Sequence, residues 1–167
     1  MSHLIRRATI NDVVQVSNLY VTVLKNSFKG IFSEGYLSKL TPTSSQRQWT
    51  KNIENPNNVV LVLQSDKEIV AMIVGSFGYE GRKVSNMGSI LAVYVKPEYE
   101  RMGYGKKLVL ALFDEFKKLN ITKCVAKVFK NNHNKGFFED VGGVLVEERP
   151  VDEAHVISMF IYKWDRI

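Results

Sequence analysis

The sequence VKPEYERMGYGKKL, residues 95–108, lies between an apolar run and an amphipathic helical pattern. Gly103 and Gly105 carry no Cβ, so an anion can approach the backbone of this turn closely. The first turn of the following helix leaves N–H groups unpaired, and the helix dipole adds partial positive charge there. Because Arg101 and Lys106 add further positive charge, the segment has the chemistry of a phosphate-binding turn.

A Gly-x-Gly pair alone is a weak signal, because many strand-to-helix turns contain glycine for structural reasons only. A dinucleotide-binding fingerprint needs a third glycine three residues after the second, where this chain has Leu108. A mononucleotide P-loop needs Gly-Lys-Ser/Thr after four spacer residues, and the sequence does not contain that pattern. The turn therefore predicts a phosphate site of another kind, with a plain structural turn as the alternative.

The hydrophobic periods around this turn predict an α/β chain. Two β-branched runs separated by a polar turn, residues 59–63 and 69–74, are typical of a hairpin. Residues 27–40 are aromatic and contain two glycines, which indicates a loop with a short helix. We expect strands at residues 3–8, 59–63, 69–74, 89–95, 121–129, 144–147 and 156–162, and helices at residues 12–26 (capped by Asn11 and Asp12), 43–55 and 131–141. The helix after the glycine turn should pack through Leu108, Leu112, Phe113, Phe116 and Leu119.

Length and composition bound the class of protein. The 167 residues suit one domain, and without repeats or linkers we expect residues 1–167 to form a single domain. No apolar run reaches the roughly 18–20 residues that span a bilayer, and the N-terminus lacks a secretory leader pattern, so we expect no membrane association. The single cysteine, Cys124, cannot form an internal disulfide and lies in an apolar run, which favours the cytoplasm and a packing role.

The charge indicates a polyanionic partner or serves solubility, with 23 Lys and Arg against 17 Asp and Glu and a net charge of +6. Nucleic acid is one polyanion, and a phosphorylated cofactor is another. Because the positive charge clusters beside the glycine turn and no stacking-aromatic motif occurs, we predict a phosphorylated cofactor and no nucleic acid. No group of residues has metal-ligand spacing, so no metal is predicted.

Several segments together resemble the GCN5-related N-acetyltransferase (GNAT) family. Residues 95–108 resemble its central motif, Gln/Arg-x-x-Gly-x-Gly/Ala, and IRRATIND (residues 5–12) is similar to its first strand and helix cap. NHNKGFFEDVGG (residues 132–143) is similar to the later Asn…Phe-Tyr-Glu-x-x-Gly-Gly/Phe helix, and IYKW (residues 161–164) to a common ending. These segments follow the family's order over nearly the whole chain.

The resemblance implies a mixed, mostly antiparallel sheet of about seven strands with about four helices. Its fourth and fifth strands, here residues 89–95 and 121–129, would splay apart and receive the pantetheine arm of acetyl-CoA like an added strand. Backbone groups of residues 93–95 would bond the acetyl carbonyl and pantetheine, and the glycine turn would hold the pyrophosphate. The cofactor-binding residues implied in this way are Val93, Tyr94, Val95, Arg101, Met102, Gly103, Tyr104, Gly105, Lys106, Asn131, Asn132 and Phe138, with Asn131 and Asn132 as alternatives of a one-residue alignment choice.

This sequence departs from the family's pattern where proton transfer is concerned. Phe138 aligns with a tyrosine that is a frequent general acid, and Ser89 stands where relatives often carry glutamate. Glu100 occupies the Gln/Arg position and places an acid near the diphosphate. Histidine is the residue type suited to base work near neutral pH, so His133 and His155 are candidates, although surface histidines are the plainer account of both. The catalytic residues are therefore unknown from sequence, and a chain of water molecules could deprotonate the amine.

The resemblance implies transfer of an acetyl group from acetyl-CoA to a primary amine on a small molecule or peptide. A catalytically weak acyl-CoA-binding module of the same fold is the alternative, and a homodimer is compatible with the family. The acceptor is expected near Phe28, Phe32, Tyr36 and Trp49, which could equally be core residues. Acidic side chains that could attract a cationic amine, or lie in a solvated turn, are Glu147, Glu148, Asp152 and Glu153.

Overall fold

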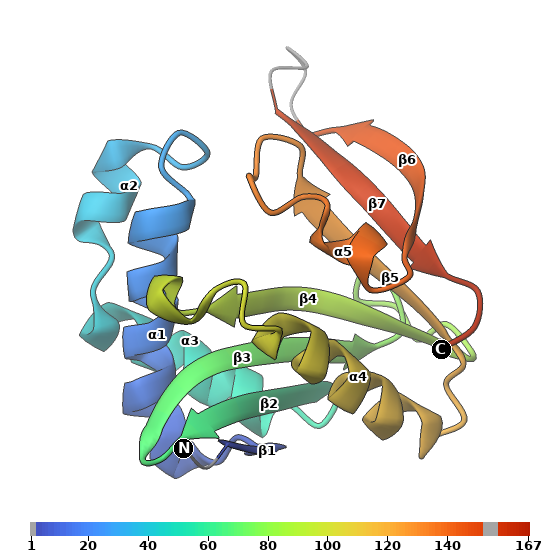
Figure 1. Cartoon of the computed structure of the whole chain (residues 1–167), viewed down its shortest axis with the longest axis horizontal. Coiled ribbons are helices and arrows are strands. Elements are labelled where there is room, and N and C mark those ends of the chain that lie inside the picture. Colours follow the sequence, from blue (N-terminus) through green and yellow to red (C-terminus); the bar gives the residue numbers. More distant parts are fainter. Residues whose placement is uncertain (1–2, 152–156) are drawn as a thin grey trace.

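A computed structural model describes residues 3–151 and 157–167, and these form one seven-stranded sheet in the order β1-β2-β3-β4-β5-β7-β6 (Figure 1). Neighbouring strands in it are antiparallel except β4 and β5, which are parallel. The strands are β1 (His3–Arg7), β2 (Asn58–Ser65), β3 (Glu68–Phe77), β4 (Met87–Val95), β5 (Lys123–Phe129), β6 (Val144–Pro150) and β7 (Ser158–Trp164). The mixed sheet agrees with the predicted fold class.

Helices cover both faces of the sheet. The described residues contain five α-helices, and the fifth beyond the four predicted by range is α2, which lies where a loop with a short helix was expected. They are α1 (Val13–Ser27), α2 (Glu34–Lys39), α3 (Pro42–Glu54), α4 (Tyr104–Lys117) and α5 (Phe137–Asp140), with 3-10 turns η1 (Ile10–Asp12) and η2 (Pro97–Tyr99). α4 lies across one face of the sheet, while α1 and α3 lie on the other face (Figure 1). No helix in the described ranges is both long and apolar enough to cross a membrane.

The corner between β1 and α1 is held by a buried carboxylate. Asp12 was expected to cap the helix, but its side chain makes no cap bond to α1. It accepts hydrogen bonds from the Thr9 backbone N–H at 2.7 Å and from the two terminal nitrogens of Arg6 at 2.7 and 2.9 Å. Hydrogen bonding from the Arg6 guanidinium holds the pKa of Asp12 below its usual range despite burial.

Two predicted helix boundaries are wrong. Leu119 lies beyond the end of α4 and is 53% exposed, so it does not join the packed side. The helix expected over residues 131–141 is limited to α5, and residues 131–136 form turns. The Asn132 side-chain oxygen accepts the Asn134 backbone N–H at 2.8 Å. Such local bonds from asparagine compete with helix formation, which explains the shorter helix.

The sheet opens between β4 and β5. Their pairing runs only from Met87 opposite Lys123 to Ile90 opposite Ala126. Beyond it, β4 continues beside β3 alone, and β5 continues beside β7 alone. A bulge in β4 marks the start of the opening: Ala92 and Ile90 pair with consecutive residues of β3, so Leu91 has no partner and is 55% exposed. The predicted splay is present.

Candidate functional site

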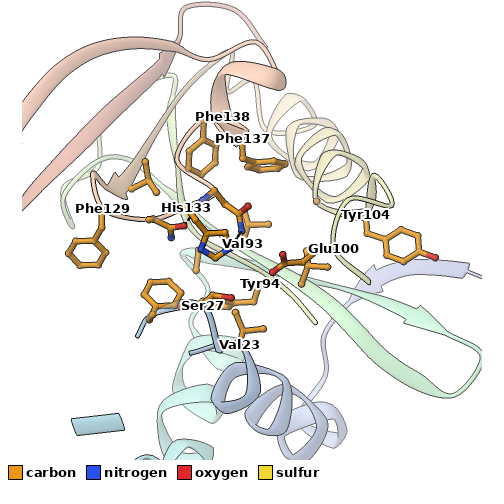
Figure 2. A pocket seen from close by; sticks show the side chains of 18 of the residues that line it. Val23, Ser27, Val93, Tyr94, Glu100, Tyr104, Phe129, His133, Phe137 and Phe138 are labelled. Carbon is orange, nitrogen blue, oxygen red and sulfur yellow. Dashed lines mark hydrogen bonds between the residues drawn. The ribbon is translucent and has the colours of Figure 1, made fainter. Parts of the chain in front are cut away.

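A cavity of about 560 Å³ occupies the opening between β4 and β5. It runs from the turn that precedes α4 to the C-terminal end of α1, and α5 lies along it (Figure 2). Its walls include residues 91–95 of β4, residues 127–129 of β5 and Met159 of β7. Figure 2 shows Glu100 and Tyr104 toward one end and Phe129 at the other.

The turn before α4 has an unusual backbone. Arg101 and Gly103 both adopt left-handed conformations, with φ of +63° and +79°. A left-handed conformation costs a residue other than glycine about 1–2 kcal/mol, so the strain at Arg101 requires compensation from its surroundings. Gly103 is the N-cap of α4 and offers no side-chain cap, which leaves the first N–H groups of a 14-residue helix open. Alternation of this kind produces concave sets of backbone donors that suit anions.

The structure brings most of the predicted cofactor residues to this cavity. Those that line it are Val93, Tyr94, Val95, Arg101, Gly103, Tyr104, Gly105, Lys106, Asn132 and Phe138. Met102 lies outside the lining, with its side chain 55% exposed. Asn131 lines a separate hollow of about 170 Å³ beside Gly30 and Ile31, so of the two asparagines Asn132 is the one on the main cavity.

Several lining residues are fixed by contacts outside the cavity. The Tyr104 hydroxyl lies 2.6 Å from His3 Nε2 on β1, so this ring anchors the turn to the sheet edge. Phe138 packs on Trp164 and Tyr162, each with ring centroids 5.8 Å apart. Phe137 was not predicted and lies against Gly105, where an added Cβ would come within 3.0 Å of its ring. Gly105 therefore serves close packing, whereas Gly103 serves backbone conformation.

The candidate proton-transfer groups are mostly engaged or unsuitable. The buried Ser89 hydroxyl donates to the Gly78 carbonyl. Burial raises the pKa of Tyr20 to about 12 and that of Tyr94 above its ordinary value, so both stay protonated. Among the described lining residues His133 is the one histidine, and it projects into the cavity in Figure 2. His155 lies outside the described residues.

The end of the cavity beside α1 is aromatic. Phe28 and Phe32 are stacked with centroids 5.4 Å apart at 15°, and Phe129 meets Phe32 edge-on at 5.7 Å and 84°. Of the predicted acceptor residues, Phe28 and Phe32 line the cavity. Tyr36 contacts Phe32 without lining it, and Trp49 is buried in the core beside Tyr20. Sequence reasoning missed the lining residues Tyr20, Val23, Leu24, Ser27, Leu91, Lys127, Phe129, Phe137, Asp140 and Met159.

The acidic residues predicted near the acceptor are paired where they are described. Glu147 accepts from the Arg149 guanidinium at 2.8 and 3.1 Å, and Glu148 accepts from Lys130 at 2.8 Å. Asp152 and Glu153 lie outside the described residues.

The sequence matches the model of the Acetyltransferase (GNAT) family over residues 22–142. It is 27% identical over 155 residues to a spermidine N(1)-acetyltransferase of Thermoplasma acidophilum, covering 89% of this chain and 91% of that protein.

Solved structures share the fold. A crystal structure of PaiA N-acetyltransferase from Thermoplasma acidophilum in complex with coenzyme A has a TM-score of 0.77 and 24% identity, and the match covers 98% of both chains. An N-acetyltransferase from Staphylococcus aureus Mu50 has a TM-score of 0.78 and 14% identity over 99% of both chains. The ribosomal-protein-S18-alanine N-acetyltransferase of Escherichia coli has a TM-score of 0.72 and 15% identity, over 97% of this chain and 92% of that one.

Proposed function

This chain belongs to the acetyltransferase (GNAT) family, which uses acetyl-CoA, and on that premise we propose that its cavity transfers the acetyl group to a primary amine. The observation that carries the proposal is the opening between β4 and β5, directly beside the uncapped N-terminus of α4. A long, narrow thioester with a charged diphosphate at one end needs both features. The opening supplies a groove for the arm, and the helix end supplies donors for the phosphates.

The residues present fit such a cofactor. Backbone groups of residues 93–95 have β3 on one side and, in the described pairing, no β5 partner on the other, so they remain available for hydrogen bonds. The left-handed turn at Arg101 and Gly103 would hold the diphosphate, with Lys106 adding charge. Asn132 would bond the pantetheine arm. We assign cofactor contact to the predicted residues that line the cavity. Met102 would contribute through its backbone amide alone, because that amide belongs to the same turn.

Bound acetyl-CoA supplies an activated acyl group, and this chain's residues must orient it and stabilise developing charge. A backbone N–H near Val93 would polarise the carbonyl oxygen, as oxyanion donors do. Phe137 and Phe138 line part of the cavity with apolar rings, which would limit the access of water to the thioester. The acceptor amine must lose a proton, because a lysine-like amine has an ordinary pKa of about 10.4. The apolar end beside α1 disfavours the charged ammonium, so desolvation lowers the pKa of the amine and water can carry the proton away.

A second candidate is a module that binds acyl-CoA with little turnover. Two observations favour it: Phe138 cannot donate a proton to the leaving sulfur, and the Ser89 hydroxyl is engaged with Gly78. A related protein is named a spermidine N(1)-acetyltransferase, so spermidine belongs in the first panel of amines, together with amino acids, peptide N-termini and simple amines.

Calorimetry with matched glycine variants tests the cofactor site. Gly103 and Gly81 both have positive φ, at +79° and +73°, and both would place a Cβ in open space. Gly103→Val should weaken acetyl-CoA binding at least about tenfold, because the turn must change its backbone conformation. Gly81→Val carries the same backbone penalty in the β3–β4 loop and should bind like the wild type. Equal affinity in the two variants would contradict the assignment.

Product analysis separates the enzyme from the binding module. Mass spectrometry should detect an acetylated amine, about 42 Da heavier as acetyl replaces hydrogen, from at least one member of the panel. Tight binding of acetyl-CoA without product from any amine would favour the module.

A further inference from the structure

The aromatic end of the cavity, which we define as Leu24, Phe28, Phe32, Leu91, Phe129 and Met159 with Lys127, has a composition that restricts the acceptor. Its apolar members come from α1, the segment after α1, the β4 bulge, β5 and β7, so five parts of the chain converge there. Phe28 and Phe32 are stacked, and Phe129 meets Phe32 edge-on, so the three rings form one continuous aromatic wall. Such a wall stabilises an apolar body of similar size.

The charged side chain that lines this end is a cation, and its charge is compensated by a carboxylate outside the lining. Among the described residues that line the aromatic end, Lys127 is the charged one, two positions before Phe129 and therefore on the same face of β5. The other charged lining residues, Glu100, Arg101, Lys106 and Asp140, belong to the turn before α4, to α4 itself and to α5. A cationic acceptor that entered the aromatic end would therefore find no carboxylate among its described lining residues.

The carboxylate nearest to Lys127 is already committed. Glu80 Oε1 accepts from Lys127 Nζ at 2.6 Å and from Arg149 Nη1 at 2.7 Å, and hydrogen bonding from Lys127, with Arg149 second, lowers the pKa of Glu80 to about 2. Arg149 is in turn held by Glu147. The two cations and two carboxylates of this cluster thus neutralise one another next to the aromatic end. Among the residues that the structure describes at the aromatic end, a second ammonium group on a substrate would have to displace one of these pairs to find a counter-ion.

The cost of removing water from an ammonium group distinguishes monoamine acceptors from polyamine acceptors. An ammonium that enters this wall without a carboxylate loses hydration. In return it gains only the cation–π attraction of the phenylalanine rings, about 0.5–2 kcal/mol, which is smaller than the cost of burying an unpaired charge. A monoamine avoids this cost once its single amine is deprotonated at the thioester, because the rest of the molecule is apolar. A polyamine retains at least one further charge on the segment that must pass the rings.

On the basis of the proposed function, we infer that the acceptor is a primary monoamine carried on an apolar body of aromatic size, an arylalkylamine, and that polyamines are selected against. The amine nitrogen would form its bond to the acetyl carbonyl carbon while the bond to sulfur breaks. The amine proton leaves to solvent, and the coenzyme departs as its thiol or thiolate. The aromatic body remains against Phe28, Phe32 and Phe129.

The first test compares 2-phenylethylamine with spermidine at saturating acetyl-CoA, using the full chain. We expect kcat/KM for 2-phenylethylamine to exceed that for spermidine at least about tenfold, the scale on which pocket contacts discriminate. Phe32→Ala, or Phe32→Leu should the alanine variant fail to fold, should lower kcat/KM for 2-phenylethylamine and leave the low value for spermidine unchanged. A preference for spermidine overturns the inference.

The second test reverses the charge. Lys127→Glu removes the positive side chain from the lining and frees one bond of Glu80, so kcat/KM for spermidine should rise about tenfold relative to the wild type. Lys117→Glu makes the same charge change on α4, outside the cavity lining, and should leave both amines unaffected. An equal response to the two variants overturns the role of Lys127.

Calorimetry with acetyl-CoA distinguishes a wrong acceptor class from a wrong proposed function. If the protein binds acetyl-CoA but prefers spermidine, the inferred acceptor class is overturned. The same holds if it binds acetyl-CoA and acetylates neither amine. Absence of acetyl-CoA binding overturns the proposed function itself.

Discussion

Glu100 places a negative side chain where the proposed site holds a diphosphate. It lines the cavity next to Arg101, whose left-handed backbone helps to form the turn. The cost of Glu100 to cofactor binding depends on its distance from the phosphates and on solvent screening. Two unit charges about 4 Å apart in water interact by about 1 kcal/mol. An acid at this place therefore weakens binding without preventing it.

Glu100→Gln should tighten acetyl-CoA binding about fivefold at low salt, because it removes a repulsion of about 1 kcal/mol. Calorimetric Kd values at low and high ionic strength provide the measurement, and the gain should shrink as salt screens the charge. Glu98→Gln is the matched control, since Glu98 is exposed on η2 and lies outside the cavity lining. A gain of the same size in the control would indicate a general charge effect.

At the scale of elements, α4 is fitted closely to the sheet. A Cβ at Gly88 of β4 would lie 2.5 Å from the Phe116 ring, and one at Gly75 of β3 would lie 2.6 Å from Leu112. These glycines let the helix approach β3 and β4, and β4 lines the cavity. The position of the glycine turn relative to β4 therefore depends on packing several turns further along α4.

Gly88→Ala should destabilise the protein by about 1–3 kcal/mol, because the added methyl overlaps a fully buried ring. Urea denaturation of Gly88→Ala and Gly35→Ala makes the comparison. Gly35 lies in α2, and a Cβ added there would have nothing within 4 Å, so alanine should be neutral or slightly stabilising. Equal stability of the two variants would contradict the close fit of α4.

The corner between β1 and α1 should make stability depend on acid pH. The folded pKa of Asp12 is lowered, so its contribution is complete above the unfolded value of about 3.9 and is lost as pH falls through the folded value. At pH 7 we expect Asp12→Asn to cost about 1.5–3 kcal/mol, as for hydrogen bonds to a charged group. Denaturation curves should show this difference shrinking at acid pH, whereas a difference independent of pH would indicate a steric effect.

The central strands and the long helices could be predicted because their hydrophobic periods match burial in the structure, as in β2, β3 and α4. Boundaries were less predictable where local polar bonds compete, as at Asn132 and Asp12. The left-handed conformation of Arg101 has no sequence signal, since arginine rarely adopts it.

At the scale of the whole molecule, the cofactor half of the cavity was predictable and the acceptor half was not. The first depends on a continuous motif before α4, whereas the second is assembled from α1, β4, β5 and β7. Phe129 and Met159 carry no motif, and their meeting with Phe28 depends on how the sheet opens. Packing of distant segments therefore limits sequence prediction of the acceptor site.

Cys124 offers a probe of how the two parts of the sheet hold together. It lies buried in the paired stretch of β5, and burial raises the pKa of its thiol to about 12. Ellman's reagent should react with the native protein only through opening of the sheet. Acetyl-CoA at about ten times its Kd should slow that reaction about tenfold, if the open form does not bind it. Rapid labelling of the native protein would contradict this.

The short pairing of β4 with β5 has a consequence for self-association. Unpaired strand edges normally invite pairing with other chains, and proteins protect outer edges with charge, bulges or covering segments. Here two such edges face each other inside the molecule, with α1, α5 and the turn before α4 around them. A polypeptide strand with side chains needs more room between these elements than a thin, unbranched amide chain does. The fold thus keeps unpaired backbone N–H and C=O groups available to a ligand without presenting them at an outer edge, where they would promote aggregation.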